Sequence, residues 1–410
     1  MKIAGTFNLL LSGLVMVFFL CVGAGYGHDS ELPIKLLWQK EFIQDSNKHY
    51  ELGSATINKP DNRLIVMVGA FSQLKAPRDY PGVDDEKLRE IDEHCPWEDD
   101  GKPWLWEIDF EGNHRRNVIL ENAPEVSWSR MDSDFRDIET CWNGGFIVLG
   151  IDRLLKVDPN GNTSIIKTIQ EFTMLDICRS DDHYFVVGYN SSRPFAIELN
   201  SQLAEVTTQT YDITEKKSGF FFTQCIPNKS KRGFIGTGMS SRSISFVLCA
   251  DEHGKELSKA LFDGYPPSSH GTRPQLCVLD SGIIIVSMGT YSDLQVTRAY
   301  SPDLELLWKK EYSDIKSTGS EFQLADINEK HFAIVGYKKV CSKNLSVYVY
   351  DDEGVEYGNK LIDFDEEIRE ANFQIVSDDD CLYVVAQSWK KGAPSKIIIT
   401  ALEIKTRDGR

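Results

Sequence analysis

The chain has 410 residues, of which 41% are hydrophobic and 26% charged, and this balance excludes disordered, collagen-like and coiled-coil architectures. Its 62 acidic residues outnumber its 45 basic ones, which gives a formal charge of −17 and argues against nucleic acid as a partner. Aromatic residues make up 11% of the chain, and with 30 glycines and 15 prolines they favour a β-rich protein with many turns.

Residues 1–27 have the plan of a secretory signal peptide. Lys2 precedes an apolar stretch, Leu9 to Val22, and small residues follow it. We therefore expect cleavage after Ala24 or Gly27 and a secreted or periplasmic protein that has no membrane contact afterwards. An uncleaved anchor is the alternative, because the stretch from Ile3 to Gly25 is almost long enough to cross a bilayer, which takes about 20 apolar residues.

From residue 34 onward the sequence repeats a four-strand pattern with a period near 50 residues. The second strand of each copy is a nearly continuous run of β-branched and aromatic residues, which is typical of strands that are buried on both faces. Seven such strands are expected, at residues 63–69, 145–150, 183–188, 233–238, 282–287, 331–336 and 381–386.

A turn follows the third strand of each copy, and it opens with Asp, Asn or Ser. These side chains start turns by bonding their own backbone, while the glycine that often follows accepts a left-handed conformation. The opening residues are Asp109, Asp158, Asn200, Asp251, Ser301, Asp351 and Asp408.

The two ends of the repeat region complement each other. The last copy stops before a fourth strand, while residues 34–42 form a strand without a partner and match residues 306–312, the fourth strand of the fifth copy. A period near 50 with four strands is typical of a propeller blade. The sequence therefore predicts an all-β, seven-bladed β-propeller of four-stranded antiparallel blades, closed by the N-terminal strand completing the last blade.

With Gly-Gly-Phe-Ile-Val-Leu-Gly at residues 144–150 and Asp-Pro-Asn-Gly-Asn at residues 158–162, the chain resembles exported β-propellers with WD40-like or quinoprotein-like repeats. The resemblance covers about residues 34–410 and implies the fold. This broad group includes quinone-dependent dehydrogenases, lyases, sugar-binding proteins and assembly scaffolds, so the resemblance leaves the function open.

Eight cysteines follow the expected signal peptide, and none forms a Cys-x-x-Cys pair. Four of them occupy nearly the same place in successive copies: Cys141, Cys178, Cys225 and Cys277. We expect small buried strand residues there rather than bridges. Packed sheets lie about 10 Å apart, whereas the Cα atoms of a disulfide lie about 4.4 to 6.8 Å apart.

The largest break in the repeat is an insertion at residues 74–107, which contains a predicted short helix at 84–94 and then Trp97. Loops carry the differences between blades, so this insertion is a candidate lid or docking element. The alternative is a decorated loop that caps its own blade.

Loops at the same position in other blades carry cations despite the acidic composition. Arg and Lys side chains on one face could capture a carboxylate, a phosphate or an anionic sugar, with Trp389 or Tyr189 as a stacking surface. Ordinary solvated loop charge is the alternative. With Trp97, the candidate binding residues are Arg193, Arg242, Lys338, Trp389 and Lys390.

The densest oxygen cluster is Asp132, Asp134, Asp137 and Glu139. It lacks the spacing of a calcium loop, so we expect an acidic start of a strand. No His pairing suits a transition metal. We expect no metal site and no cofactor, and the sequence assigns no catalytic residue.

These observations favour a binding or scaffold protein that recognises a protein, peptide or glycan, anionic ligands included, through its loop face. An enzyme is the competing hypothesis: a hydrolase, a lyase or a quinone-dependent dehydrogenase that uses the axial channel. A dense cluster of titratable side chains in the channel would favour the enzyme. The oligomeric state stays open.

Overall fold

The computed structural model of the protein describes residues 34–42, 48–72, 102–120, 135–150, 153–168, 173–191, 193–214, 219–240, 244–263, 273–289, 294–313, 322–337, 343–365, 367–389 and 395–405. The expected signal peptide, the helix at 84–94, Trp97 and the turn at Asp408 lie outside these ranges. None of the described segments forms a helix of the length and hydropathy that a bilayer crossing needs.

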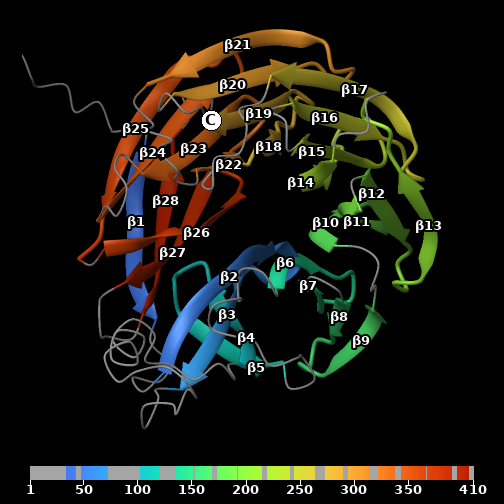
Figure 1. The fold of residues 1–410 in the computed structure, drawn as a ribbon. Coiled ribbons are helices and arrows are strands. Elements are labelled where there is room, and N and C mark those ends of the chain that lie inside the picture. The colour runs from blue at the N-terminus through green and yellow to red at the C-terminus, as the bar shows by residue number, and fades with distance from the viewer. Residues whose placement is uncertain are drawn as a thin grey trace, which may run out of the picture. The chain divides into compact units, whose positions relative to one another are not determined.

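The described strands form seven antiparallel sheets of four strands, which we call blades 1 to 7 (Figure 1). Blade 1 contains β2 (Lys48–Asn58), β3 (Arg63–Ser72), β4 (Lys102–Asp109) and β5 (His114–Ile119), with the short 3-10 helix η1 (Lys59–Asp61) after β2. Blade 2 contains β6 (Phe135–Thr140), β7 (Phe146–Gly150), β8 (Arg153–Val157) and β9 (Thr163–Thr168). Blade 3 contains β10 (Thr173–Ser180), β11 (His183–Asn190), β12 (Arg193–Leu199) and β13 (Glu205–Thr210).

Blade 4 contains β14 (Phe220–Pro227), β15 (Phe234–Ser240), β16 (Ile244–Ala250) and β17 (Glu256–Asp263). Blade 5 contains β18 (Gln275–Val278), β19 (Ile284–Gly289), β20 (Gln295–Tyr300) and β21 (Leu306–Tyr312). Blade 6 contains β22 (Phe322–Asp326), β23 (His331–Tyr337), β24 (Asn344–Asp351) and β25 (Glu356–Asp363). Blade 7 contains β26 (Glu367–Asp378), β27 (Cys381–Trp389), β28 (Ile397–Ile404) and the N-terminal strand β1 (Ile34–Phe42).

The seven blades form a closed ring. The first strand of each blade contacts the first strand of the next, from β2 through β6, β10, β14, β18, β22 and β26, and β26 in turn contacts β2. The ring is sealed by β1, which pairs antiparallel with β28 so that Trp38 lies opposite Ala401 and Glu41 opposite Ile398. The predicted seven-bladed propeller and its N-terminal closing strand are confirmed.

The apolar core lies between neighbouring blades. One cluster, for example, joins Met67 and Leu105 of blade 1 to Ile138 and Val148 of blade 2. All five residues of β7 are buried, which is the expected result for a second strand that has a neighbouring blade on each side. The run of β-branched residues in each second strand is therefore explained, because both faces of that strand pack against apolar side chains.

The turns after the third strands have the predicted Asx geometry. In blade 1, Asp109 Oδ1 accepts a hydrogen bond from the backbone nitrogen of Asn113 at 2.6 Å, and Gly112 adopts a left-handed φ of 76°. In two other turns the left-handed residue is a leucine, Leu203 with φ 66° and Leu304 with φ 64°. The turn opened by Asn or Ser thus keeps its shape without glycine, at the cost of a strained backbone.

Candidate functional site

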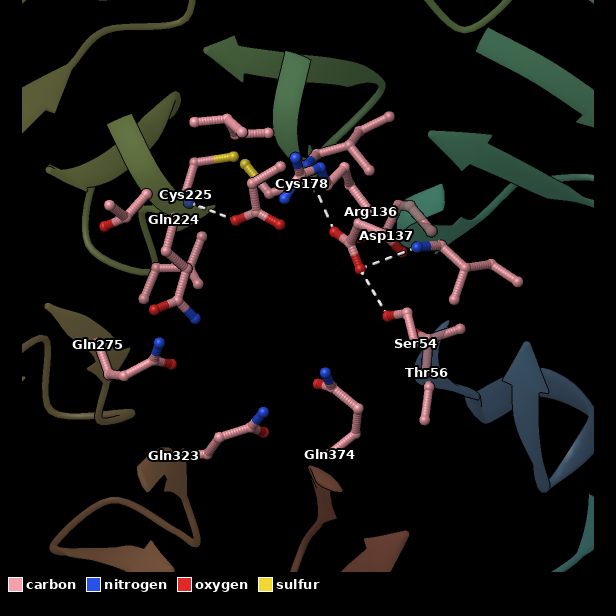
Figure 2. A pocket seen from close by; sticks show the side chains of 18 of the residues that line it. Ser54, Thr56, Arg136, Asp137, Cys178, Gln224, Cys225, Gln275, Gln323 and Gln374 are labelled. Atoms are coloured by element: carbon pink, nitrogen blue, oxygen red, sulfur yellow. Dashed lines mark hydrogen bonds between the residues drawn. The ribbon is translucent and has the colours of Figure 1, made fainter. Parts of the chain in front are cut away.

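A cavity of about 420 Å³ lies where the first strands of all seven blades meet (Figure 2). Each of these inner strands contributes one polar side chain at the same place, and we call this set the channel belt. Its members are Ser54, Asp137, Asp176, Gln224, Gln275, Gln323 and Gln374.

An extra residue in the inner strand precedes the belt position in blades 1 to 4. The pairing of inner and second strands shifts at Gly53, Arg136, Leu175 and Thr223, immediately before Ser54, Asp137, Asp176 and Gln224. A β-bulge bends its strand and re-aims the side chain that follows it. The bulges therefore account for polar side chains on the channel wall in strands that otherwise pack between blades.

Belt side chains join neighbouring blades by hydrogen bonds at four junctions. The belt side chain of one blade accepts a bond from a backbone nitrogen of the following blade. The donor–acceptor pairs are Ile177 to Asp137 (3.3 Å), Cys225 to Asp176 (2.5 Å), Leu276 to Gln224 (2.7 Å) and Ile375 to Gln323 (2.9 Å). Between blades 7 and 1 the acceptor is Gln387 of β27, whose side chain accepts a hydrogen bond from the backbone nitrogen of Leu52 at 3.0 Å.

The two carboxyl groups of the belt touch. Asp137 and Asp176 are hydrogen-bonded to each other, and Ser54 Oγ donates a further bond to Asp137 at 3.0 Å. Burial raises the pKa of both carboxyls, and the neighbouring charge of Asp137 raises the pKa of Asp176 further. The raised pKa values of the two neighbouring carboxyls favour retention of a proton by the pair over two adjacent carboxylates.

Glu139 extends this acidic side of the channel along β6. Burial raises the pKa of Glu139 to about 7, against an opposing hydrogen bond from the nitrogen of Thr140 at 2.6 Å. Nearby, the Arg179 guanidinium lies 3.3 Å from the ring centre of Trp142, whose residue is 53% exposed. Within the described residues, no group of three His, Cys, Asp or Glu side chains is arranged to hold a metal ion.

The opposite side of the channel is a wall of amides. Gln224, Gln275, Gln323 and Gln374 point into the cavity from blades 4 to 7 (Figure 2). The amide of Gln323 makes two hydrogen bonds to blade 7. Its oxygen accepts from the nitrogen of Ile375, and its Nε2 donates to the carbonyl oxygen of Phe373 at 2.8 Å. Among the described residues, the amides of Gln275 and Gln374 make no hydrogen bond, so these two groups face the cavity with their bonding capacity open.

Of the binding residues expected from the sequence, Arg193 is described with its side chain. It is 51% exposed, and its Nη1 lies 3.7 Å from Asp212 Oδ1 of its own blade. Tyr189 packs against Phe221 of the next blade, with ring centres 5.8 Å apart. Trp97, Arg242, Lys338 and Lys390, together with the side chain of Trp389, lie outside the described residues.

Sequence reasoning missed the belt, although a signal for it exists. A polar residue followed by an apolar one recurs at the same place in the first strand of six copies. These pairs begin at Asp137, Asp176, Gln224, Gln275, Gln323 and Gln374. Of the acidic cluster weighed as a calcium site, Asp137 and Glu139 lie within β6, and Asp132 and Asp134 lie outside the described residues.

No protein-family model matches the chain, and no curated protein matches its sequence. Solved structures match its fold. The WD40 domain of coronin from Toxoplasma gondii is 8% identical, with a TM-score of 0.54 over 92% of this chain and 88% of that one. BBS1N, solved in complex with ARL6DN, is 12% identical, with a TM-score of 0.50 over 92% of this chain and 99% of that one.

A PQQ-bound aldose sugar dehydrogenase from Streptomyces coelicolor is 11% identical, with a TM-score of 0.42 over 66% of this chain and 95% of that one. At these identities the matches show the fold alone. The chain is a seven-bladed β-propeller, as the sequence predicted, and its fold is similar to that of the coronin WD40 domain.

Proposed function

We propose that the protein is an exported, non-enzymatic β-propeller that binds the end of a glycan or a peptide in its channel. The amide wall supports this best, because Gln275 and Gln374 face a cavity of about 420 Å³ with donors and acceptors to spare. An amide donates through nitrogen and accepts through oxygen, which suits sugar hydroxyls and peptide groups alike. Such a ligand could pair with both amides at once.

We propose that the loops between second and third strands provide the rim of this site. Because antiparallel strands alternate in direction, these loops all leave their blades at the end where the inner strands begin. Arg136 and Arg273 also line the cavity. These cations favour a ligand with a carboxylate or another anionic group. The proposed rim residues are Trp97, Arg193, Arg242, Lys338, Trp389 and Lys390.

An array of acidic and neutral glycans and of peptides, probed with the labelled protein, tests the proposal, and calorimetry of each hit then gives its affinity. We expect Gln275→Ala and Gln374→Ala each to weaken binding about tenfold, the loss that matches one or two hydrogen bonds. Gln202→Ala, an exposed glutamine in a turn of blade 3, is the matched control and should bind as the unaltered protein does. Binding that survives both channel changes would contradict a channel site.

The pair of Asp137 and Asp176 favours a second candidate, a hydrolase or lyase that uses the channel. Two carboxyls sharing a proton can act as acid and base. However, Gln224 and Gln323 make the same bonds to the next blade at the same belt position, which supports a structural role for the aspartates. Mass spectrometry of each bound ligand after incubation decides between the two: conversion that Asp176→Asn abolishes would favour the enzyme.

A further inference from the structure

Two cysteines meet across the junction of blades 3 and 4. Cys178 of β10 and Cys225 of β14 are hydrogen-bonded through their side chains, and Figure 2 shows their sulfur atoms directed toward each other. Both residues are buried, at 2% and 3% exposure.

The surrounding bonds hold this geometry in place. Asp176 accepts a hydrogen bond from the backbone nitrogen of Cys225 at 2.5 Å, so this belt residue aligns β14 against β10. The Cys225 thiol lies 3.7 Å from the carbonyl oxygen of Phe185, and Phe185 is the register partner of Cys178 in blade 3. The same short stretch of blade 3 therefore fixes both sulfurs.

The expectation that equivalent cysteines lie too far apart for a bridge used the spacing of parallel, stacked sheets. That spacing of about 10 Å does not apply near the axis of a propeller, because the blades are wedges whose inner strands converge. Cys178 and Cys225 lie on inner strands, where the blades are closest.

We propose that Cys178 and Cys225 form an interblade disulfide under oxidising conditions, and that the structure describes the reduced pair. In the exchange with a disulfide-bearing oxidant such as oxidised glutathione, one protein thiolate attacks the oxidant's S–S bond, which gives a mixed disulfide and releases one glutathione thiol. The second protein thiolate attacks the mixed disulfide and releases the other. The protein loses two protons and two electrons, and the oxidant is reduced to two thiols.

The bond forms as the blades assemble rather than afterwards. Burial raises the pKa of the Cys225 thiol, so the folded protein holds little of the reactive thiolate. The bridge would close a loop that contains the three outer strands of blade 3, and it would limit the conformations of the unfolded chain. Such a bond suits the expected export of the protein, because extracellular and periplasmic compartments preserve disulfides.

Refolding the full chain in a glutathione redox buffer tests the proposal. The protein is denatured with reductant, refolded with reduced and oxidised glutathione, alkylated while unfolded and digested with trypsin without reduction. We expect the peptide that ends at Arg179 to be joined to the peptide that ends at Lys229, since each contains one cysteine. Recovery of both peptides in alkylated form would overturn the proposal.

Thermal unfolding supplies a second measurement. The oxidised protein should melt about 3 to 5 °C above the same protein kept in reductant, as expected for a bridge of this loop length in a large domain. Cys178→Ser should abolish this difference, whereas Cys277→Ser, a change at an equally buried cysteine, should preserve it. If the serine variants fail to fold, the peptide map of the unaltered chain still decides the question.

Discussion

Trp38 Nε1 donates a hydrogen bond of 2.8 Å to the carbonyl oxygen of Phe110, which joins the N-terminal strand of blade 7 to a turn of blade 1. The same arrangement occurs between blades 5 and 6, where Trp308 Nε1 donates to the carbonyl of Asp352 at 2.7 Å. The matching sequences of β1 and β21 are thus explained by a shared contact: the tryptophan of each outer strand is hydrogen-bonded to the turn of the following blade. We call these contacts the tryptophan ties.

Replacing the indole of either tryptophan by a phenyl ring removes the donor and keeps most of the apolar surface. We expect Trp38→Phe and Trp308→Phe each to lower the free energy of unfolding by about 1 kcal/mol. Because the two ties lie at different blade junctions, the double variant should lose the sum of the two. Urea denaturation measures all three, and an unchanged midpoint for Trp38→Phe would rule out a stabilising tie.

Gly112 lies against the side chain of Trp38, and Gly144 provides a matched comparison for its substitution. A Cβ atom at Gly112 would stand 3.0 Å from the side chains of Trp38 and Lys40, whereas a Cβ atom at Gly144 would meet nothing within 4 Å. Both glycines have a left-handed φ, 76° and 79°, so alanine strains the backbone equally at both.

We expect Gly144→Ala to cost about 1 kcal/mol from backbone strain alone. Gly112→Ala should cost about 1 to 3 kcal/mol more, because the indole must also move. Equal losses in the two variants, measured by chemical denaturation, would mean that Trp38 does not pack tightly on this turn.

Asp176 can be tested by separating its charge from its hydrogen bonds. Burial raises the pKa of this carboxyl and so favours its neutral form; Asp176→Asn keeps a neutral acceptor for the Cys225 nitrogen and should change stability by less than about 1 kcal/mol. Asp176→Leu leaves that nitrogen without its partner and should cost about 1 to 3 kcal/mol. If the leucine variant is as stable as the asparagine one, the belt bond does not stabilise the junction.

The buried carboxyls predict that stability falls as pH rises. Glu139 has a pKa of about 7 in the folded protein and about 4.5 in the unfolded chain, so between these values the folded state binds the extra proton. Its contribution is therefore fully present below about pH 4.5 and is lost as pH rises to about 7, by at most about 3 kcal/mol. The raised pKa values of Asp137 and Asp176 act in the same direction.

Urea midpoints measured at pH 5 and pH 8 check this dependence. Glu139→Gln removes the titrating group and keeps the side-chain shape, so its midpoint should change less between the two pH values. A variant with the full pH dependence of the unaltered protein would show that Glu139 is not responsible.

The fold could be predicted because its signals are local and repeated. Each second strand is an apolar run, and residues 34–42 match a fourth strand elsewhere in the chain, which identified the closing strand. The belt could not be predicted in the same way, because a single Asp or Gln in a strand does not reveal which side it faces. The bulges before Asp137, Asp176 and Gln224 decide that, and they arise from pairing with the second strand.

The contact between the two cysteines escaped prediction for a related reason. Similar positions in the repeat indicated that Cys178 and Cys225 are buried, which is correct. Their separation depends on how far the wedges converge near the axis, and the spacing of residues along the sequence carries no information about that angle.

The pairing of β1 with β28 also dictates an order of events during synthesis. Among the strands of the ring, β1 is synthesised before the others and its partner β28 after them, so β1 stays unpaired while the six intervening sheets form. If translation stops before β28, the ring stays open and β1 and β27 are left as unpaired edge strands, which are sites for aggregation. The ring therefore closes only after β28 has been synthesised.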